Sequence, residues 1–374
     1  MPFERAALTK QRILHITPWY PNERQPGQAV WIQRHVRCLE PYFDQHVLHI
    51  EVEFGGIGFR KKKEESLTEI SVRIPWLNWR LREWIYWIIL FSFCIRNRTH
   101  RTFDIVNFHI AYPACVWEHR ISRLLPKKKI ITEHWSYYHF HFHSRYKLTR
   151  IKNIFKRGIP VITVSEALAR DIELFAGNKI DFRVVPNAVD QQLFHLDESV
   201  IQTDQFFMAA YWKAPKNPFA VLHGINVLKE KGIIIKVRIA GYGPLWEQLK
   251  SQVSLLQLED QIELIGKIDS AQMCKELNRA TAFILPSEYE TFSVVCAEAL
   301  SCGCPVLSEP FGALPELVTP GNGLLREEEE TWSSLLERFV HHAPFDRKSI
   351  ADRSREKYSS EKVGLLYSDV LKAL

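Results

Sequence analysis

Short apolar runs alternate with segments of helical spacing along the chain. Residues 12–17 form the first apolar run, residues 18–27 form a loop with three prolines and a glycine, and residues 30–39 have helical spacing. The chain therefore begins with a strand, a loop and a helix. Residues 55–63, which are rich in glycine and lysine, are predicted as a turn. Further strands are predicted at residues 46–54, 70–74, 104–109, 129–132, 160–164 and 184–187.

The same alternation begins again after residue 190. Strands are predicted at residues 205–209, 233–240, 262–264, 282–285 and 305–307, and helices at residues 218–231, 245–256, 271–277 and 292–300. This pattern favours the α/β class, with two doubly wound parallel-sheet halves rather than one large sheet. We therefore divide the chain into domains at residues 1–188 and 189–348, followed by one or two amphipathic helices at residues 349–374 that could pack back on the first domain.

Composition and charge narrow the functional classes. The 374 residues are 46% hydrophobic and 25% charged, which is typical of soluble globular proteins and excludes disordered and collagenous chains. The net charge is +6, but residues 1–188 hold 30 basic and 17 acidic side chains and the remainder holds 19 and 26, so the two parts carry +13 and −7. Such asymmetry indicates that one part meets an anionic partner, which is a nucleic acid, a membrane surface or a phosphorylated substrate.

The cysteines and the hydropathy pattern indicate in which cellular compartment the protein is expected. The seven cysteines are odd in number and form no C-x-x-C pair, and the start of the chain has no secretory signal, so we expect a reduced, cytosolic protein. No apolar window reaches the ~18 to 20 residues of a membrane span. The longest candidate, residues 84–95, is bounded by several arginines. Two interpretations of this segment stay open, an interfacial helix on an anionic membrane and a helix buried in the domain.

The densest candidate chemistry lies at residues 283–306, FILPSEYETFSVVCAEALSCGCPV. A buried strand is followed by a polar turn and a helix, and ligands of open α/β sheets bind beyond such strand ends, where helix N–H groups favour phosphate. The first turn of this helix, with Phe292 and Ser293, is therefore a candidate diphosphate site. Glu290 and Glu298 could each accept hydrogen bonds from a polyol ligand. The alternative is that both glutamates are exposed surface residues.

This segment resembles the E-x7-E signature of the family 4 glycosyltransferases, in which Glu290, Phe292, Glu298, Gly303 and Pro305 have counterparts. The resemblance implies the GT-B fold, which is two Rossmann-like doubly wound parallel-sheet domains facing a central cleft. It also implies that Glu290 contacts the donor sugar and that Glu298 binds the ribose hydroxyls. Ser293 stands where the family usually has glycine.

Further segments match the same family. The segment RVVPNAVDQQLF, residues 183–194, resembles its interdomain motif. Lys213 and Lys216 in YWKAPKNP match a basic pair that grips the donor diphosphate, with Lys213 in a position where arginine is more familiar. Gly241 and Gly243 in VRIAGYGP match a turn whose backbone approaches the nucleotide. Taken without the family, the lysines would be solvated loop residues and the glycines would only close a turn.

Two matches lie in the first domain. The resemblance implies that Gly27, in the loop after the first strand, faces the donor diphosphate, and that His134 in ITEHW borders the donor sugar and acceptor and has a catalytic role. His139, His141 and His143 follow, but their alternating spacing is not that of a zinc site. No D-x-D triplet occurs, so no metal and no other cofactor is expected, and lysines and helix N–H groups would stabilise the departing diphosphate.

The resemblance implies a metal-independent retaining glycosyltransferase that moves a sugar from a nucleoside diphosphate sugar to a carbohydrate or lipid-linked acceptor in cell-surface polysaccharide or glycolipid synthesis. Retention would proceed by same-face attack. We expect a cytoplasmic protein whose basic domain contacts the inner face of the membrane. Two alternatives remain, an epimerase or phosphorylase with the same fold, and a nucleic-acid-binding protein that uses residues 60–63 and 127–129. Because those basic runs lack interleaved aromatics, no nucleic acid is expected as a partner.

Overall fold

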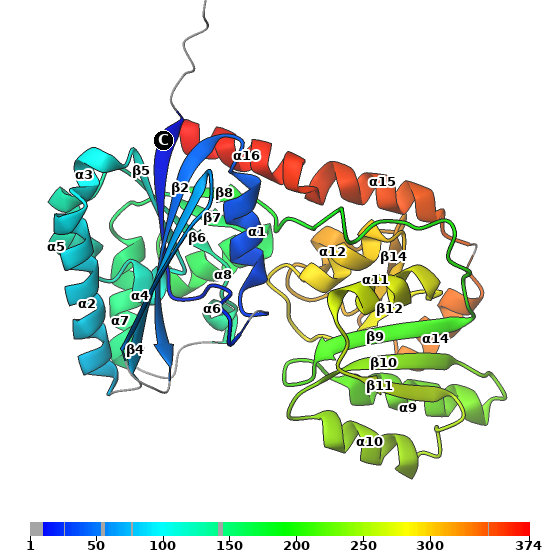
Figure 1. Cartoon of the computed structure of the whole chain (residues 1–374). Coiled ribbons are helices and arrows are strands. Elements are labelled where there is room, and N and C mark those ends of the chain that lie inside the picture. The colour runs from blue at the N-terminus through cyan, green and yellow to red at the C-terminus, as the bar shows by residue number, and fades with distance from the viewer. Residues whose placement is uncertain (1–9, 26, 54–56, 76–77, 141–144, 343) are drawn as a thin grey trace, which may run out of the picture. The chain divides into compact units, whose positions relative to one another are not determined.

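The chain folds into two compact units (Figure 1). The computed structural model describes residues 10–25, 27–53, 57–75, 78–140, 145–342 and 344–374. Residues Met1–Ala188 and Ser360–Leu374 form the first unit, and Val189–Ser359 forms the second. Each unit is an α/β structure built on its own sheet, as the sequence pattern predicts.

The first unit contains an eight-stranded sheet in the order β3-β4-β2-β1-β5-β6-β7-β8. All neighbouring strands are parallel except β3 and β4, which are antiparallel. Every residue of β5 is buried, as expected for a parallel strand covered by helices on both faces. The strands are β1 (Gln11–Thr17), β2 (Phe43–Glu53), β3 (Gly58–Lys63), β4 (Leu67–Pro75), β5 (Ile105–His109), β6 (Lys128–Glu133), β7 (Val161–Thr163) and β8 (Phe182–Val184).

Helices cover both faces of this sheet, and Figure 1 shows α2 and α5 on one side with α1 and α16 on the other. Caps define some of their ends: Ser165 accepts a hydrogen bond from the Leu168 N–H at the start of α8, and Gly177 ends that helix in the left-handed conformation. The helices are α1 (Val30–Cys38), α2 (Trp79–Arg96), α3 (Thr99–Thr102), α4 (Ala111–Ala114), α5 (Glu118–Ile121), the 3-10 helix η1 (Ser122–Leu124), α6 (Tyr137–Phe140), α7 (Arg145–Phe155), α8 (Glu166–Ala176) and α16 (Ser360–Lys372).

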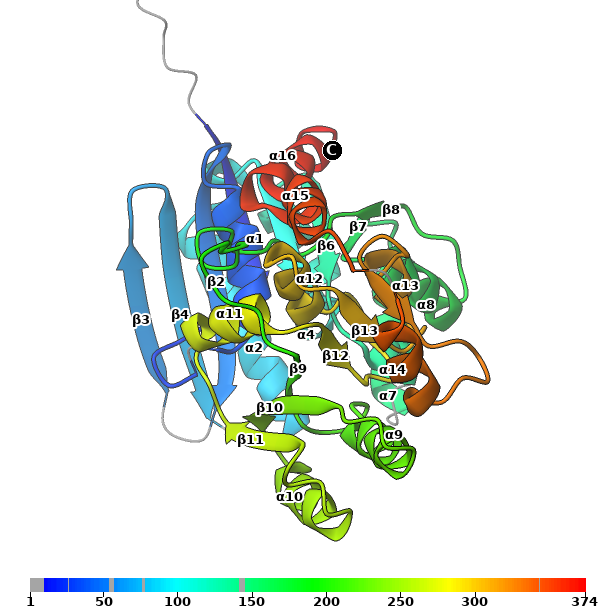
Figure 2. The same cartoon turned by 90° about the vertical axis from the view of Figure 1, so that its right-hand side faces the viewer.

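The basic segment that the sequence predicted as a turn is instead the edge strand β3, which Figure 2 shows beside β4. The prediction was wrong for residues 58–63, whereas residues 55–56 of the predicted turn lie outside the described part of the chain. All residues of β3 after Gly58 are exposed, so the strand has no apolar face to reveal it. Charged side chains are common on edge strands because they oppose pairing with another chain.

The second unit contains a six-stranded parallel sheet in the order β11-β10-β9-β12-β13-β14. Figure 1 shows α9 and α10 on one side of it and α11 and α12 on the other. The strands are β9 (Gln205–Tyr211), β10 (Lys236–Tyr242), β11 (Ile262–Gly266), β12 (Phe283–Leu285), β13 (Val306–Ser308) and β14 (Gly323–Leu325). The helices are α9 (Pro218–Glu230), α10 (Trp246–Leu255), α11 (Ser270–Arg279), α12 (Val294–Ser301), α13 (Leu314–Leu317), α14 (Trp332–Val340) and α15 (Arg347–Tyr358).

The C-terminal segment, residues 349–374, forms two helices that are divided between the units. Helix α15 belongs to the second unit, where the Arg347 guanidinium donates to the carbonyls of Ala280 and Leu277. Helix α16 belongs to the first unit and packs against α1. A Cβ at Gly364 would lie 2.2 Å from the Cys38 carbonyl oxygen, so only glycine permits this approach. Helix α16 thus packs back on the first unit, as the sequence analysis allowed, whereas α15 packs in the second unit, because the two helices bury apolar residues in different cores.

Strand order locates the candidate ligand edge in each sheet. The chain leaves β9 for β10 on one side and later returns to β12 on the other side of β9. The carboxyl ends of β9 and β12 therefore form a topological switch point, where open α/β sheets bind ligands. In the first unit the corresponding pair is β1 and β5.

Candidate functional site

Two loops meet at the switch point of the second unit. The Asn217 N–H donates to the Pro286 carbonyl over 2.7 Å, and the Glu288 N–H donates to the Pro215 carbonyl over 3.0 Å. An isolated antiparallel bridge also joins Lys216 to Ser287. The loop after β9 is thereby fixed to the loop after β12, although the two are far apart in the sequence.

This junction brings two predicted site residues together. The Lys216 ammonium donates to Glu290 Oε1 over 2.8 Å, and the side chains are 22% and 16% exposed. Both groups are thus partly shielded but still reach solvent, and a shielded ion pair is screened less by salt than a surface pair. Lys213 is exposed, and its ammonium lies 5.5 Å from the ring centroid of Tyr211, a cation–π distance. The two predicted diphosphate lysines therefore have different surroundings.

The backbone of Glu290 is supported by the loop after β13. Its carbonyl accepts a hydrogen bond from the Ala313 N–H over 2.9 Å. The neighbouring Gly312 has φ +61°, and a Cβ there would lie 2.3 Å from the Glu290 carbonyl oxygen. Sequence reasoning missed Gly312, although the pair of small residues after a buried strand was a usable signal. Glycine at this position lets one loop fix the other.

Ser293 caps the amino end of α12 in the left-handed conformation, with φ +73°. The helix begins at Val294, two residues after the predicted start at Phe292. This conformation favours glycine, which accounts for the glycine that is usual at this position in the family that the sequence resembles. Serine adopts it here at a cost in backbone strain. The Phe292 side chain is buried and packs edge-on against Tyr358, with ring centroids 5.5 Å apart. A donor could therefore meet only the Phe292 backbone, because its ring lies in the core.

Glu298 lies in the middle of α12 with intermediate exposure. Its carbonyl accepts a hydrogen bond from the Cys302 N–H over 3.1 Å, within the last turn of the helix. Glu290 and Glu298 are therefore held by one strand–loop–helix element, with Glu290 in the loop and Glu298 on the helix, as the sequence pattern predicted.

Gly241 and Gly243 serve internal packing. They have φ of +126° and +132°, and Cβ atoms at these positions would lie 2.0 Å from the Ala210 carbonyl oxygen and 2.6 Å from the Trp212 carbonyl oxygen. Trp212 is fully buried, and its indole N–H donates to the Ala240 carbonyl over 2.8 Å. The close contacts that exclude a side chain here come from the protein itself, and a nucleotide contact at these two glycines stays a prediction.

Gly27 has open surroundings in the turn between β1 and α1. It is exposed, and a Cβ there would meet nothing within 4 Å. Neither packing nor a left-handed backbone demands glycine here. The position therefore leaves room for an external ligand.

His134 follows β6 and belongs to a group of buried histidines. Its ring is stacked with that of His109, with centroids 6.1 Å apart and planes at 16°, and lies 5.3 Å from the ring of His35. Burial holds the pKa of His134 well below its ordinary value, and His35 acts in the same direction while a hydrogen bond with Asn187 opposes it. The imidazole is neutral at pH 7, so it can orient a hydroxyl but does not carry a proton to donate as an acid.

Glu133, a buried carboxyl that sequence reasoning missed, holds the loop of His134. It accepts hydrogen bonds from the Tyr138 hydroxyl and the Ala111 N–H, both over 2.6 Å, and from the His134 N–H over 3.1 Å. Burial raises the pKa of Glu133, and these donors oppose that rise. The only sequence signal was a charged residue at the end of a buried strand. Glu133 is a positioning residue for His134.

The described residues contain no group of three or more His, Cys, Asp or Glu side chains placed to hold a metal ion. His139 lies 3.5 Å from Asp171 across an exposed surface. His141 and His143 lie outside the described residues.

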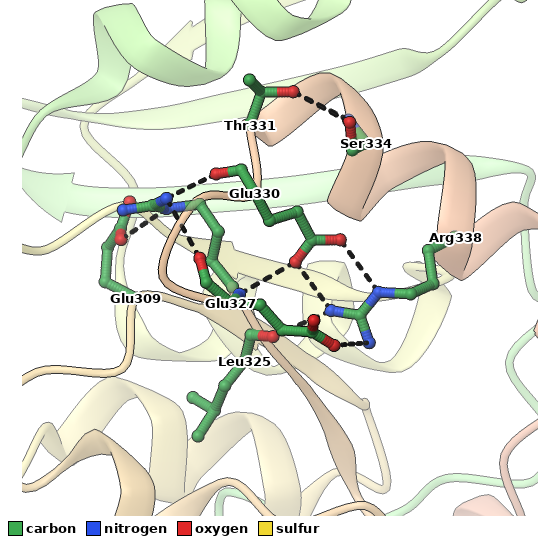
Figure 3. A network of polar contacts seen from close by, with 8 residues as sticks. Glu309, Leu325, Glu327, Glu330, Thr331, Ser334 and Arg338 are labelled. Carbon is green, nitrogen blue, oxygen red and sulfur yellow. Dashed lines mark hydrogen bonds and ion pairs between the residues drawn. The ribbon is translucent and has the colours of Figure 1, made fainter.

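An open pocket of about 560 Å³ lies beside the Glu288 turn and is lined by Asn217, Glu288, Glu309, Arg326 and Trp332, among others. Two of its acidic residues, Glu309 and Glu330, are paired with arginines, and Figure 3 shows this network. Glu309 accepts from Arg326 over 2.7 Å and from the Trp332 indole over 2.8 Å, and Arg338 donates to Glu330 over 2.8 Å. These contacts fix the loop after β14, so the pocket wall is a preorganised polar surface.

Comparisons with known proteins agree with this architecture. Residues 16–193 match the family model Glycosyltransferase Family 4, and residues 200–357 match the model Glycosyl transferases group 1. WcaL of Salmonella typhimurium, a glycosyltransferase assigned to colanic acid biosynthesis, is 32% identical over 155 residues, which is 39% of this chain and 38% of WcaL. The chain thus covers well under two thirds of the length of this relative.

Two further proteins match over more of their length. The N-acetyl-alpha-D-glucosaminyl L-malate synthase of Bacillus anthracis is 24% identical over 303 residues, 72% of this chain and 75% of that protein. The crystal structure of Anabaena HepE in complex with UDP and glucose has a TM-score of 0.73 at 16% identity and covers 97% of this chain and all of its own. The predicted family and the predicted GT-B fold are thereby confirmed. This chain belongs to the family 4 glycosyltransferases.

Proposed function

We propose that this protein transfers a sugar from a nucleoside diphosphate sugar to a carbohydrate or lipid-linked acceptor, with retention at the anomeric carbon. The observation that carries the proposal is the Lys216–Glu290 pair at the switch point of the second sheet. One cation for a diphosphate and one carboxylate for sugar hydroxyls lie side by side there. HepE, which shares the fold, was solved with UDP and glucose, and this supports a donor of the same chemical class.

Electrostatic stabilisation of the departing diphosphate is the main catalytic contribution in this proposal. An ammonium has three donors, so Lys216 can keep one hydrogen bond to Glu290 while it binds a phosphate oxygen. Lys213 adds a second charge, and the free N–H groups in the first turn of α12, next to Ser293, favour phosphate as well. Glu298 is assigned to the ribose hydroxyls, and Gly27 to a backbone contact with the diphosphate. We propose no cofactor.

Retention requires either a carboxylate nucleophile or attack on the face that the leaving group departs from. The Glu290 carboxylate is engaged by Lys216 at 2.8 Å, which makes it a poor free nucleophile. We therefore assign same-face attack, in which the leaving phosphate assists the acceptor hydroxyl. His134, as a neutral imidazole, orients a sugar hydroxyl in this scheme.

The exposed apolar residues of helix α2 are the feature that supports the proposal of a membrane-bound acceptor. Its buried positions are Glu83, Tyr86, Leu90 and Cys94, whereas Leu81, Trp84 and Ile95 are 45%, 55% and 52% exposed. None of the helices in the described part of the chain is long and apolar enough to cross a membrane. A helix with exposed apolar residues and with arginines at both ends suits an anionic surface, at ~1 kcal/mol per basic residue. We propose peripheral attachment of the first unit to the cytoplasmic face of the membrane and a role in cell-surface polysaccharide or glycolipid synthesis.

Donor hydrolysis over a panel of UDP-, GDP- and ADP-sugars tests the function. The wild type should release one nucleoside diphosphate, and Glu290→Ala should lose this turnover. Glu247→Ala is the matched control, because Glu247 is an exposed glutamate on α10 in the same unit. Isomerised sugar nucleotide without nucleotide release would indicate an epimerase, a requirement for phosphate would indicate a phosphorylase, and thermal stabilisation by an oligonucleotide alone would refute the transferase.

A further inference from the structure

Two cysteines of the second unit lie within reach of one another. Cys274 on α11 and Cys302, at the carboxyl end of α12, have their Sγ atoms 4.0 Å apart. All seven cysteines fall within the described residues and are reduced. Six of them are buried, and Cys274 is partly exposed. A solvent-reachable thiol therefore adjoins a buried one.

The surroundings of the two sulfurs shift their pKa values in opposite directions. The Cys302 thiol and the Asn278 side-chain amide, 3.5 Å from the Cys274 sulfur, both stabilise a Cys274 thiolate. The hydrogen bond with Cys302 lowers the pKa of Cys274 to about 6. The same contact, together with burial, raises the pKa of Cys302. Burial also raises the pKa of Cys296 and Cys304 to about 12. Reactive cysteines combine thiolate character with access, and Cys274 has both.

We propose that Cys274 and Cys302 form a thiol-modification site that reacts with low-molecular-weight disulfides such as oxidised glutathione. The Cys274 thiolate attacks one sulfur of the glutathione disulfide, the S–S bond breaks, and one glutathione thiolate leaves. Cys302 then gives its proton to solvent and attacks the Cys274 sulfur, which releases the second glutathione. The cysteine pair loses two electrons, and glutathione disulfide gains them as two thiols.

Closure of the disulfide would act on α12. An S–S bond is about 2.05 Å long, so the sulfurs must approach by about 2 Å from their present separation. Cys302 ends the helix that carries Glu298, and its N–H donates to the Glu298 carbonyl. Oxidation would therefore tie α11 to the helix of a proposed donor-binding residue. The modification itself does not depend on the proposed function.

The test uses the full-length protein treated with oxidised glutathione, followed by blocking of remaining thiols with N-ethylmaleimide and peptide mass analysis after trypsin. The peptide with Cys274, residues 268–275, should be linked to the peptide with Cys302, residues 280–326, and the linked species should be lighter by two hydrogens. Cys302→Ser should instead retain one glutathione on Cys274, and Cys274→Ser should give neither product.

The long peptide also carries Cys296 and Cys304, so Cys304→Ser is the matched control and should keep the link. Loss of the link in this control, or a persistent glutathione adduct in the wild type, would overturn the proposal. A measurement that needs no variant is the alkylation rate of Cys274 by iodoacetamide, which should be half-maximal near pH 6. A midpoint near the ordinary thiol value, about 8.5, would likewise contradict it.

Discussion

The Lys216 ammonium lies 2.8 Å from Glu290 Oε1, although the two residues are 74 positions apart. Their loops follow β9 and β12, which are adjacent strands in the sheet. The two charges therefore compensate each other at the edge where a ligand is expected, and removal of either one leaves the other partly buried without its partner.

We expect Lys216→Met to lower kcat/KM for donor hydrolysis by about 10²-fold or more, since an electrostatic contact to a developing anion is worth roughly 3 kcal/mol. The control is Lys250→Met, which removes an exposed ion pair with Glu247 that contributes at most about 1 kcal/mol to stability. Steady-state kinetics on both variants checks the prediction. Equal activities in the two variants would remove Lys216 from the site.

Ser293→Gly should stabilise the protein by up to about 1 kcal/mol, because a non-glycine residue with φ +73° carries local strain. Ser251→Gly is the control, since Ser251 lies in regular helix on α10, where glycine costs about 1 kcal/mol. Urea unfolding gives both free energies. A loss of stability in Ser293→Gly comparable to that of the control would show that the serine hydroxyl matters more than the backbone.

Gly312→Ala should destabilise the second unit and weaken donor binding together, because its Cβ would collide with the Glu290 carbonyl oxygen. We expect a loss of about 2 kcal/mol or more in stability, typical of overpacking with strain at a special φ. Gly232→Ala separates the two causes, since Gly232 also has a positive φ, +81°, but open space around its Cβ. Calorimetric titration with UDP should detect weaker binding only in Gly312→Ala.

Stability should fall as pH decreases below about 6.5. Burial lowers the pKa of His15 to about 3 and of His35 to about 4, so the folded state keeps both rings neutral. Between those values and the ordinary pKa near 6.5 the unfolded chain binds protons that the folded state rejects, at a cost of up to about 1.4 kcal/mol per pH unit for each ring. The contribution of these two neutral rings to folding stability is therefore fully present above pH 6.5 and is lost as the pH falls below that value.

Urea unfolding at pH 7.5, 6.0 and 5.0 measures this slope. His15→Gln should reduce it, whatever the change in absolute stability, because one buried titrating group is removed. His100→Gln, at an exposed position, should leave it unchanged. A wild-type stability that is flat across this range would contradict the assignment of neutral buried histidines.

Trp84→Ser should reduce flotation of the protein with anionic liposomes at low salt, because it removes an exposed aromatic side chain from α2. Leu174→Ser is the control, since Leu174 is 82% exposed on α8 and lies outside the proposed surface. Unchanged flotation of Trp84→Ser would place the membrane contact elsewhere, and absence of flotation of the wild type would end the membrane proposal.

Much of the fold was readable from the sequence, because buried parallel strands are short apolar runs and the helices between them have their own period. The edge strand β3 could not be predicted, because its residues after Gly58 are exposed and show no alternation of apolar and polar positions. The division of residues 349–374 was hidden for a related reason. Helix α15 is strongly charged and α16 is more apolar, but which core receives Tyr358 and which receives Tyr367 is decided by contacts with residues remote in the sequence.

Local sequence determined the candidate site as a set of residues: the strand, turn and helix that carry Glu290 and Glu298, and the lysines after β9. Tertiary structure decided which of them meet. The pairing of Lys216 with Glu290 depends on strand order, the support of Glu290 by Gly312 on a third loop, and the neutrality of His134 on burial among other histidines. These properties arise from distance and desolvation, which act between residues remote in sequence and leave no local pattern in the chain.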